Sequence, residues 1–172
     1  MTTKICFARL NPDAVIPTKR SEDAGYDIYA CFDEEYMVIP PHETKLIPTG
    51  IASVCSENYC FILKERGSTG TKGMAQRCGV IDSGFRGEWF VPITNTSRKP
   101  LMIYNELPTR YRGVPCEEID MDSTFTLYPA SKAICQALLI PVPQTEVFEI
   151  TPEELRAFKS ERKTGALGSS QK

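Results

Sequence analysis

The chain has 172 residues, of which 41% are hydrophobic and 24% charged, and its formal net charge is −2. This length suits a single domain with a real core, and the composition is ordinary for a globular protein. The small negative charge argues against a nucleic-acid groove or an anionic membrane as the main partner. No apolar run approaches the roughly 20 residues that span a bilayer, and Met1–Phe7 lacks the pattern of a signal peptide. Together these features predict a cytoplasmic protein.

The cysteines and the single histidine narrow the chemistry. The seven cysteines are odd in number and include no C-x-x-C pair, so we expect reduced, mostly buried thiols rather than disulfides or metal ligands. The only histidine, His42, stands between Pro41 and Glu43 in a turn-like stretch. This argues against a Ser-His-Asp triad and against a Cys/His zinc set. Chemistry in this chain must therefore rest on carboxylates, arginines and hydroxyl groups.

Short runs rich in Ile, Val, Phe and Tyr, bounded by turn residues, fill most of the chain and predict β-strands. They are Lys4–Leu10, Tyr36–Ile39, Lys45–Val54, Tyr59–Lys64, Glu88–Thr94, Leu101–Tyr104, Thr124–Leu127 and Ile134–Val142. Thirteen prolines, spread along the chain, disfavour long helices. We therefore expect an all-β fold, a distorted jelly-roll-like β-barrel.

One short helix is predicted late in the chain. Thr151 is its N-cap, Pro152 its first helical residue, and Glu154 completes a capping box. The helix should run through Leu155 and on to Lys159.

Two polar segments lie outside this pattern. Asn105–Asp122 resembles an inserted loop or hairpin, and Lys163–Lys172 is small and polar, so it should be mobile unless a ligand orders it. We expect a β-barrel domain over residues 1–160, with the insertion at about 105–122, and a flexible C-terminal arm over 161–172.

The segment Gly79–Glu88, GVIDSGFRGE, has the clearest chemical pattern. Asp82 comes directly after Val80 and Ile81 and precedes a tight turn, and Phe85 follows that turn. This predicts a hairpin that presents one carboxylate at its end. From this segment alone, an aspartate that only caps its own turn explains the pattern equally well.

The same segment resembles the third of five sequence motifs of the dUTPase family, GVIDxxYRG. The other four motifs are resembled, in the family's order, by AGYD at Ala24–Asp27, the turn Arg66–Gly70, the apolar strand Ala133–Leu139 and the Gly-rich arm Arg162–Ser170. Each match has an ordinary structural explanation on its own, whereas five in order do not. The resemblance implies a β-clip fold and a Mg²⁺-dependent homotrimeric enzyme that hydrolyses dUTP to dUMP and pyrophosphate.

The resemblance also implies catalytic roles that suit the residue types. Asp82 would take the proton of the water that attacks the α-phosphorus. Arg66 would bind phosphate oxygens through its fork of N–H donors. Gln136 resembles the family glutamine near the α-phosphate. Asp27 resembles the family aspartate that holds the metal through water, while the phosphates chelate Mg²⁺.

The remaining site residues would bind the substrate. Ser68, with the neighbouring backbone at Gly67 and Thr69, would cradle the phosphate chain. Phe85 stands where the family usually has Tyr and would pack on the deoxyribose. The uracil edge would meet the extended backbone at Gln76, Gly79, Val80 and Ile81. The arm would close over the nucleotide through Arg162, Leu167, Gly168 and Ser169.

The sequence departs from the family motifs at several positions. Ser68 stands one place later than the family serine, Ser131 and Lys132 replace a Gly-Asp pair, and Leu167 replaces an aromatic lid residue. Two alternatives share the fold: a dCTP deaminase, and a regulatory protein-binding module that no longer needs turnover. A lectin-like or capsid jelly roll would explain the predicted strands but not the occurrence of the five motifs in order.

Overall fold

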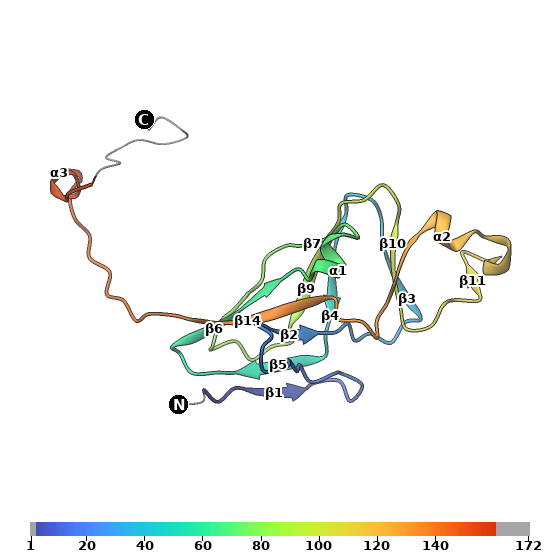
Figure 1. The fold of residues 1–172 in the computed structure, drawn as a ribbon, viewed down its shortest axis with the longest axis horizontal. Helices are drawn as coiled ribbons and strands as arrows, with labels where there is room; N and C mark the ends of the chain where they lie inside the picture. Colours follow the sequence, from blue (N-terminus) through green and yellow to red (C-terminus); the bar gives the residue numbers. More distant parts are fainter. Residues whose placement is uncertain (1–2, 161–172) are drawn as a thin grey trace. The chain divides into compact units, whose positions relative to one another are not determined.

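A computed structural model describes residues 3–160 of the chain. These residues divide into two units, the first ending at Val142 and the second beginning at Pro143. The first unit holds all the strands of the described residues, and the second holds one helix, α3, over Pro152–Ala157 (Figure 1). Among the described residues, no helix has the length and apolar character needed to cross a membrane.

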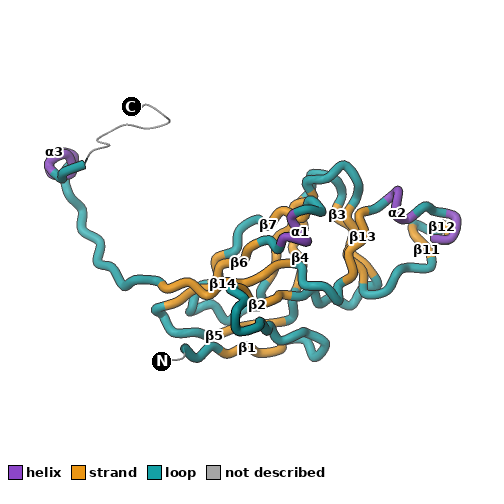
Figure 2. Tube along the Cα trace, in the orientation of Figure 1, coloured by secondary structure: helices purple, strands orange, loops and turns teal. Residues whose placement is uncertain are grey.

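The first unit is built from short strands joined by loops (Figure 2). Its largest sheet has the order β2-β14-β6-β8, with bounds Gly25–Ile28, Cys135–Pro141, Tyr59–Lys64 and Val80–Ile81. A second sheet has the order β4-β9-β7, with bounds Thr44–Pro48, Phe90–Asn95 and Met74–Gln76. A third has the order β13-β10-β3, with bounds Thr126–Pro129, Leu101–Tyr104 and Tyr36–Ile39. Strands β1 and β5 pair with each other over Cys6–Arg9 and Ile51–Val54.

This arrangement confirms the all-β, jelly-roll-like class. Most strand pairs are antiparallel, whereas β10 and β13 are parallel. The sheets stay separate in their hydrogen bonding, so within residues 3–160 no single sheet closes into a barrel.

Alternation along the strands builds one core. Phe61 and Leu63 of β6 point inward and are at most 3% exposed, and Ala137 of the neighbouring β14 is fully buried. An aromatic cluster fills the centre, because the rings of Phe7 and Phe61 both pack on the buried Trp89, with centroid distances of 5.6 and 5.0 Å. Buried apolar area of this kind is the main stabilising contribution in a domain of this size.

The segment predicted as an inserted loop or hairpin contains a hairpin. Its strands are β11, Arg110–Tyr111, and β12, Val114–Pro115. The connecting residues Arg112 and Gly113 both have positive φ, 50° and 84°, as a two-residue primed turn requires. A short 3₁₀ helix η1, Cys116–Glu118, and helix α2, Met121–Thr124, follow the hairpin and lie with it at one end of the first unit (Figure 1).

The strand predictions have two outcomes. The runs at β3, β6 and β10 have the predicted bounds, and four others are present with ends shifted by one or two residues. The single strand predicted over Lys45–Val54 is wrong, because it is two strands, β4 and β5. Gly50 has a φ of +64°, and the N–H groups of Thr49 and Gly50 both donate to the Glu88 carboxylate instead of to a ladder.

Helix α3 begins as predicted and ends early. The hydroxyl of Thr151 accepts from the Glu154 N–H, and the Glu154 carboxylate accepts from the Thr151 N–H, which completes the capping box. The predicted extension to Lys159 is wrong, because Phe158 is already extended, with a ψ of 131°.

The cysteines are all free, as predicted, but their expected burial is wrong for most of them. Only Cys135 is fully buried, and Cys6 and Cys78 are exposed. Burial raises the pKa of the Cys135 thiol, which makes that residue an inert packing group.

Candidate functional site

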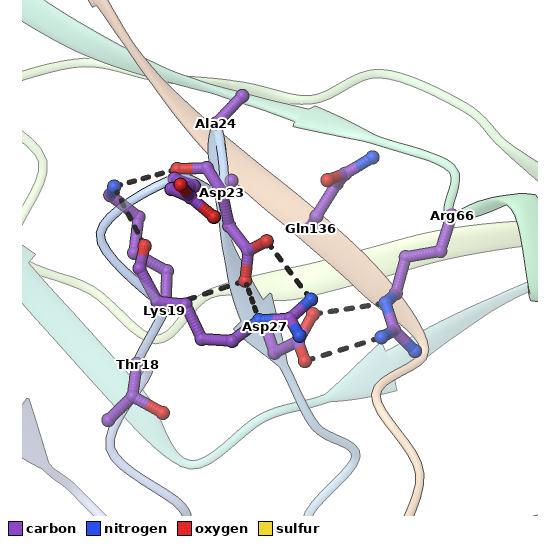
Figure 3. A pocket seen from close by; sticks show the side chains of 10 residues that line it. Thr18, Lys19, Asp23, Ala24, Asp27, Arg66 and Gln136 are labelled. Carbon is purple, nitrogen blue, oxygen red and sulfur yellow. Dashed lines mark hydrogen bonds and ion pairs between the residues drawn. The ribbon is translucent and has the colours of Figure 1, made fainter.

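The register of the largest sheet brings three predicted site residues together. Gln136, on the inner strand β14, lies opposite Asp27 of β2 on one side and Lys64 of β6 on the other. Arg66 follows the end of β6, and its Nε lies 3.0 Å from one oxygen of Asp27, while its Nη2 donates to the other at 3.3 Å. Residues from three separate motifs therefore meet at one end of the sheet (Figure 3).

These three side chains line an open pocket of about 580 Å³, which we call the Asp27 pocket. Its opposite wall is the loop of residues 18–25. Three cationic and three anionic side chains line it, so the pocket is electrostatically balanced when empty. They are Lys19, Arg20, Arg66, Glu22, Asp23 and Asp27.

Gly25 is needed for the position of Gln136. A Cβ on Gly25 would lie 2.6 Å from Oε1 and 3.0 Å from Cβ of Gln136, closer than side chains tolerate. The amide of Gln136 donates to the Glu65 carbonyl at 2.9 Å, which fixes its orientation. The glycine of the AGYD motif therefore permits a close approach of side chain to backbone.

The turn after Arg66 is the short helix α1, Gly67–Gly70. Thr69 is fully buried, and its hydroxyl accepts from the N–H of Arg66 at 2.9 Å and donates to the Arg66 carbonyl at 3.0 Å. Ser68 is exposed. Ser68 is thus the exposed residue of the two, with its side chain next to the Tyr128 hydroxyl, and Thr69 holds the turn together.

Tyr128 of β13 lies beneath this turn and was not singled out from the sequence. Its side chain is 2% exposed, and its hydroxyl donates to the Ala133 carbonyl at 2.6 Å. Burial raises the pKa of Tyr128, with smaller opposing contributions from Ser68 and Arg66. A neutral buried phenol therefore supports the turn that carries the arginine and the serine.

The 18–25 loop has its own ion pair. Arg20 donates through Nε and Nη2 to the two oxygens of Asp23, at 2.9 and 3.2 Å. These bonds lower the pKa of Asp23 and raise that of Arg20. Lys19 also donates to the loop backbone. Lys19 and Arg20 were not identified from the sequence, because isolated charges in a polar stretch are usually solvated surface residues.

The carboxylates of the Asp27 pocket do not form a metal cage. Within residues 3–160, no three Asp, Glu, His or Cys side chains gather closely enough to hold a metal ion. A paired Asp27 still has lone pairs free on both oxygens, since Arg66 takes one on each. The residues therefore fit a metal held mainly by a phosphate ligand, with Asp27 accepting hydrogen bonds from its waters.

Asp82 and Phe85 lie elsewhere, on a turn after β8 that we call the Asp82 turn, residues 82–86. The Phe85 N–H donates to the Asp82 carbonyl at 3.1 Å, and Arg86 donates to the Ser83 carbonyl at 2.6 Å. The predicted hairpin is wrong, because β8 pairs with β6 while β9 pairs with β4 and β7. The turn is real, but it joins two sheets.

A groove of about 260 Å³ adjoins this turn and has an apolar rim. Val80, Phe85 and Phe90 line it, with exposures of 63%, 43% and 44%. Ile81 and Asp82 line the same groove. This arrangement gives a carboxylate beside exposed apolar side chains.

The Asp82 turn and the Asp27 pocket are far apart within one chain. Ile81 pairs with Phe61, near the start of β6, whereas Gln136 pairs with Lys64 at the end of that strand. At about 3.3 Å per residue and about 4.8 Å between strands, Asp27 and Asp82 are separated by roughly 20 Å. A general base must approach its proton to about 3 Å. One chain therefore cannot apply Asp82 and Asp27 to the same small group.

Glu65 is hydrogen-bonded to two predicted site residues, Gln76 and Gln136. Its carboxylate accepts from the Gln76 N–H at 2.9 Å, while its carbonyl accepts from Gln136. The Gly79 carbonyl accepts from the Leu63 N–H at 2.8 Å, and a Cβ at Gly79 would lie 3.0 Å from the Leu63 carbonyl. The strand that carries Gln76 and the one that follows Gly79 are thus both held against β6.

The other predicted site residues, Arg162, Leu167, Gly168 and Ser169, lie outside the described residues.

The sequence pattern of the dUTPase family matches residues 12–106 of the chain, which include Asp27, Arg66 and Asp82. The deoxyuridine 5'-triphosphate nucleotidohydrolase of Nautilia profundicola is 30% identical over 173 residues, covering 98% of this chain and 99% of that protein. This similarity spans the Asp27 pocket and the Asp82 turn together.

Solved structures show the same fold. The Staphylococcus bacteriophage 80alpha dUTPase with dUpNHpp is similar over 99% of both chains, with a TM-score of 0.74 and 22% identity. A mutant dUTPase from phage phi11 of S. aureus, whose structure details the coordination of a structural Mg(II) ion, is similar over 88% of this chain and 99% of that one, with a TM-score of 0.66 and 21% identity. By its sequence pattern and its full-length relative, the chain belongs to the dUTPase family.

Proposed function

We propose that this protein hydrolyses dUTP to dUMP and pyrophosphate, with Mg²⁺ as cofactor. The observation that carries the proposal is the convergence of Asp27, Arg66 and Gln136 on one pocket, in a chain of the dUTPase family. Removal of dUTP by this reaction limits uracil in DNA and supplies dUMP for dTMP synthesis.

The Asp27 pocket supplies the phosphate-binding half of the reaction. Arg66 presents its N–H fork to phosphate oxygens, and its ion pair with Asp27 fixes the fork before substrate arrives. Gln136, oriented by the Glu65 carbonyl, binds near the α-phosphate. The side chain of Ser68, an exposed residue, and the backbone of Gly67 and Thr69 contact the phosphate chain. These groups neutralise charge that develops as the leaving group departs.

Asp82 acts as the general base. A water oxygen attacks the α-phosphorus, the bond from that phosphorus to the bridging oxygen breaks, and the electron pair leaves with pyrophosphate. The proton of the attacking water passes to the Asp82 carboxylate. A positioned base of this kind contributes about 10² to 10⁴ in rate.

The distance between the two halves supports a homotrimer with shared sites. Because Asp82 and Asp27 are roughly 20 Å apart in one chain, the base must come from a neighbouring chain. The exposed Val80, Phe85 and Phe90 beside Asp82 offer apolar surface that such a neighbour would cover. Three chains related by a closed rotation would then form three equivalent sites.

Selection of the nucleotide falls to the region around β7, β8 and the Asp82 turn. The backbone at Gln76, Gly79, Val80 and Ile81 would bind the uracil edge, and the Phe85 ring would pack on the deoxyribose. The C-terminal arm, residues 161–172, would close over the bound nucleotide through Arg162, Leu167, Gly168 and Ser169. Closure of this kind excludes water from the site.

Mg²⁺, when bound with the triphosphate, neutralises phosphate charge and favours attack at the α-phosphorus. Asp27 would hold it through water, since its carboxylate keeps free lone pairs beside Arg66. The ion would arrive with the nucleotide, because within residues 3–160 no three carboxylates gather closely enough to hold it alone.

A pyrophosphate-release assay with dUTP, dCTP, dTTP and UTP, each with and without Mg²⁺, tests the proposal. We expect selective turnover of dUTP that depends on Mg²⁺. Ammonia release from dCTP would point to a deaminase. Absence of any turnover would leave a protein-binding module as the better reading.

A further inference from the structure

Lys19 is a surface residue whose ammonium group is nevertheless held in place. Its Nζ donates to the Asp23 carbonyl at 2.7 Å and to the Arg20 carbonyl at 3.3 Å. The same atom lies 5.6 Å from the centre of the Tyr26 ring, within the range of a cation–π contact. Exposed lysines ordinarily keep their rotamer freedom, so three fixing contacts on one ammonium are unusual.

The contacts leave the lysine with both charge and a donor to spare. An ammonium has three N–H donors, and two of them are used on the loop carbonyls. Arg20 is held by the Asp23 carboxylate and Arg66 by Asp27. Among the described residues, Lys19 is the one cation of the Asp27 pocket that forms no ion pair within 4.0 Å, although its charge also helps to lower the pKa of the nearby Asp23.

Lys19 lines the same pocket as Arg66 and Gln136, and Figure 3 shows it on the other side of Asp27 from Arg66, with its ammonium held on the loop carbonyls. We propose that Lys19 binds the terminal phosphates of the substrate, the part that leaves as pyrophosphate. This inference rests on the proposed function, which places the α-phosphate near Gln136. When the bond to the bridging oxygen breaks, the electron pair and its negative charge go to the pyrophosphate, where a fixed ammonium stabilises them.

The Arg20–Asp23 pair has a different part in this arrangement. It closes the loop whose carbonyls hold Lys19, because the Arg20 N–H and side chain both donate to the Asp23 carboxylate. Arg20 is therefore a positioning residue, and Lys19 is the one that contacts phosphate.

Calorimetric binding of inorganic pyrophosphate, in the presence of Mg²⁺, tests the inference directly. Lys19→Met keeps the length of the side chain and removes the charge, so we expect its affinity for pyrophosphate to fall about tenfold. Lys19→Arg should stay close to wild type. Lys4→Met serves as the matched control, since Lys4 is exposed and outside the pocket, and it should leave the affinity unchanged.

Binding of dUMP supplies the second measurement. Because dUMP lacks the terminal phosphates, Lys19→Met should bind it as wild type does. An unchanged pyrophosphate affinity in Lys19→Met would overturn the inference. An equal loss for pyrophosphate and dUMP would also overturn it, because that pattern means a disturbed loop. If Lys19→Met weakens pyrophosphate binding as expected, but the wild-type protein does not turn over dUTP, then the proposed function is refuted and the role of Lys19 in phosphate binding is not.

Discussion

The Asp27 pocket and the Asp82 turn differ in how far one chain completes them. In the pocket, Arg66 and Asp27 already form a two-bond ion pair, and Gln136 is oriented by a backbone carbonyl. At the turn, a carboxylate lies beside exposed apolar side chains, and Nη1 of Arg86 donates to the carbonyls of Ser83 and Phe85 in the turn itself. Under the proposed function, the first region would be a preorganised anion site, whereas the second would supply a base to a substrate held by another surface.

The largest expected effect comes from the second region. Asp82→Asn keeps the shape of the side chain and removes the proposed base, so kcat should fall by at least about 10² while nucleotide binding persists. Steady-state kinetics and calorimetry with a non-hydrolysable dUTP analogue measure the two quantities separately. Near-normal turnover by Asp82→Asn would show that Asp82 is not the general base.

Mixing two inactive variants tests whether each active site takes residues from two chains. Arg66→Ala and Asp82→Asn chains should each be nearly inactive alone. If one chain supplies Arg66 and its neighbour Asp82, co-refolded mixtures in equal amounts should recover about a quarter of wild-type activity, since a quarter of the sites then carry both intact residues. No recovery in a well-mixed oligomer would mean that each chain builds its own site.

A smaller loss is expected from the hydroxyl of the α1 turn. Ser68→Ala should lower kcat about tenfold, because Ser68 is exposed beside Arg66. Thr69→Ala should chiefly lower the free energy of unfolding, by about 1 kcal/mol, because its buried hydroxyl holds the turn. Thermal melts and kinetics of both variants separate the two effects. If Thr69 proved the more sensitive residue in catalysis at full stability, the assignment of the serine would be wrong.

Gly25→Ala perturbs the pocket without touching a charged group. The added Cβ would press on Gln136, so that side chain must move away from the Glu65 carbonyl. We expect kcat/KM to fall about tenfold and stability to drop by about 1 kcal/mol. Gly84→Ala controls for the added Cβ alone, because nothing lies within 4 Å of a Cβ there; since Gly84 lies in the Asp82 turn, the quantity compared is pyrophosphate binding, which it should leave unchanged.

The sugar preference should respond to the ring on the Asp82 turn. Phe85→Ala should narrow the ratio of kcat/KM between dUTP and UTP by a few-fold, because the ring no longer packs on the deoxyribose. Gly87→Ala should do the same more weakly, since its Cβ would lie 2.7 Å from Cζ of the Phe85 ring and displace it. An unchanged ratio in both variants would remove Phe85 from the site.

Local patterns predicted the parts of the molecule that local sequence determines. The strands at β3, β6 and β10 and the capping box of α3 follow from alternation and from Thr151 with Glu154. Strand β2 was not predicted, because glycine and aspartate are poor strand formers and it is held by pairing with the distant β14. Thr49 and Gly50 likewise leave the ladder where Gly50 has a positive φ, and their N–H groups donate to the distant Glu88 carboxylate.

The same division applies to the candidate site. Its residue types could be read from motifs, but the separation of Asp82 from Asp27 depends on the pairing of β8 with one end of β6 and of β14 with the other. The pairing register of strands that are distant in the sequence cannot be predicted from a short stretch of residues. Lys19 was missed for a related reason, because its importance lies in the carbonyls and the ring that fix it.

The smallest expected effect concerns Glu65, the residue that adjoins both Gln76 and Gln136. Its pKa is lowered, chiefly by hydrogen bonds from its own N–H and, against the effect of burial, from that of Gln76. A carboxyl with a lowered pKa in the folded state contributes stability above its unfolded value, about 4.3, and loses it as the pH falls through the folded value.

Glu65→Gln keeps an acceptor for the Gln76 N–H but has no charge to titrate. We therefore expect the variant to melt about 1–2 °C below wild type at neutral pH, with the gap closing as the pH drops well below 4.3, and turnover at neutral pH to change less than about twofold. Melting curves over that pH range measure the gap, and a gap independent of pH would show that packing, and not the charge of Glu65, links the two neighbourhoods.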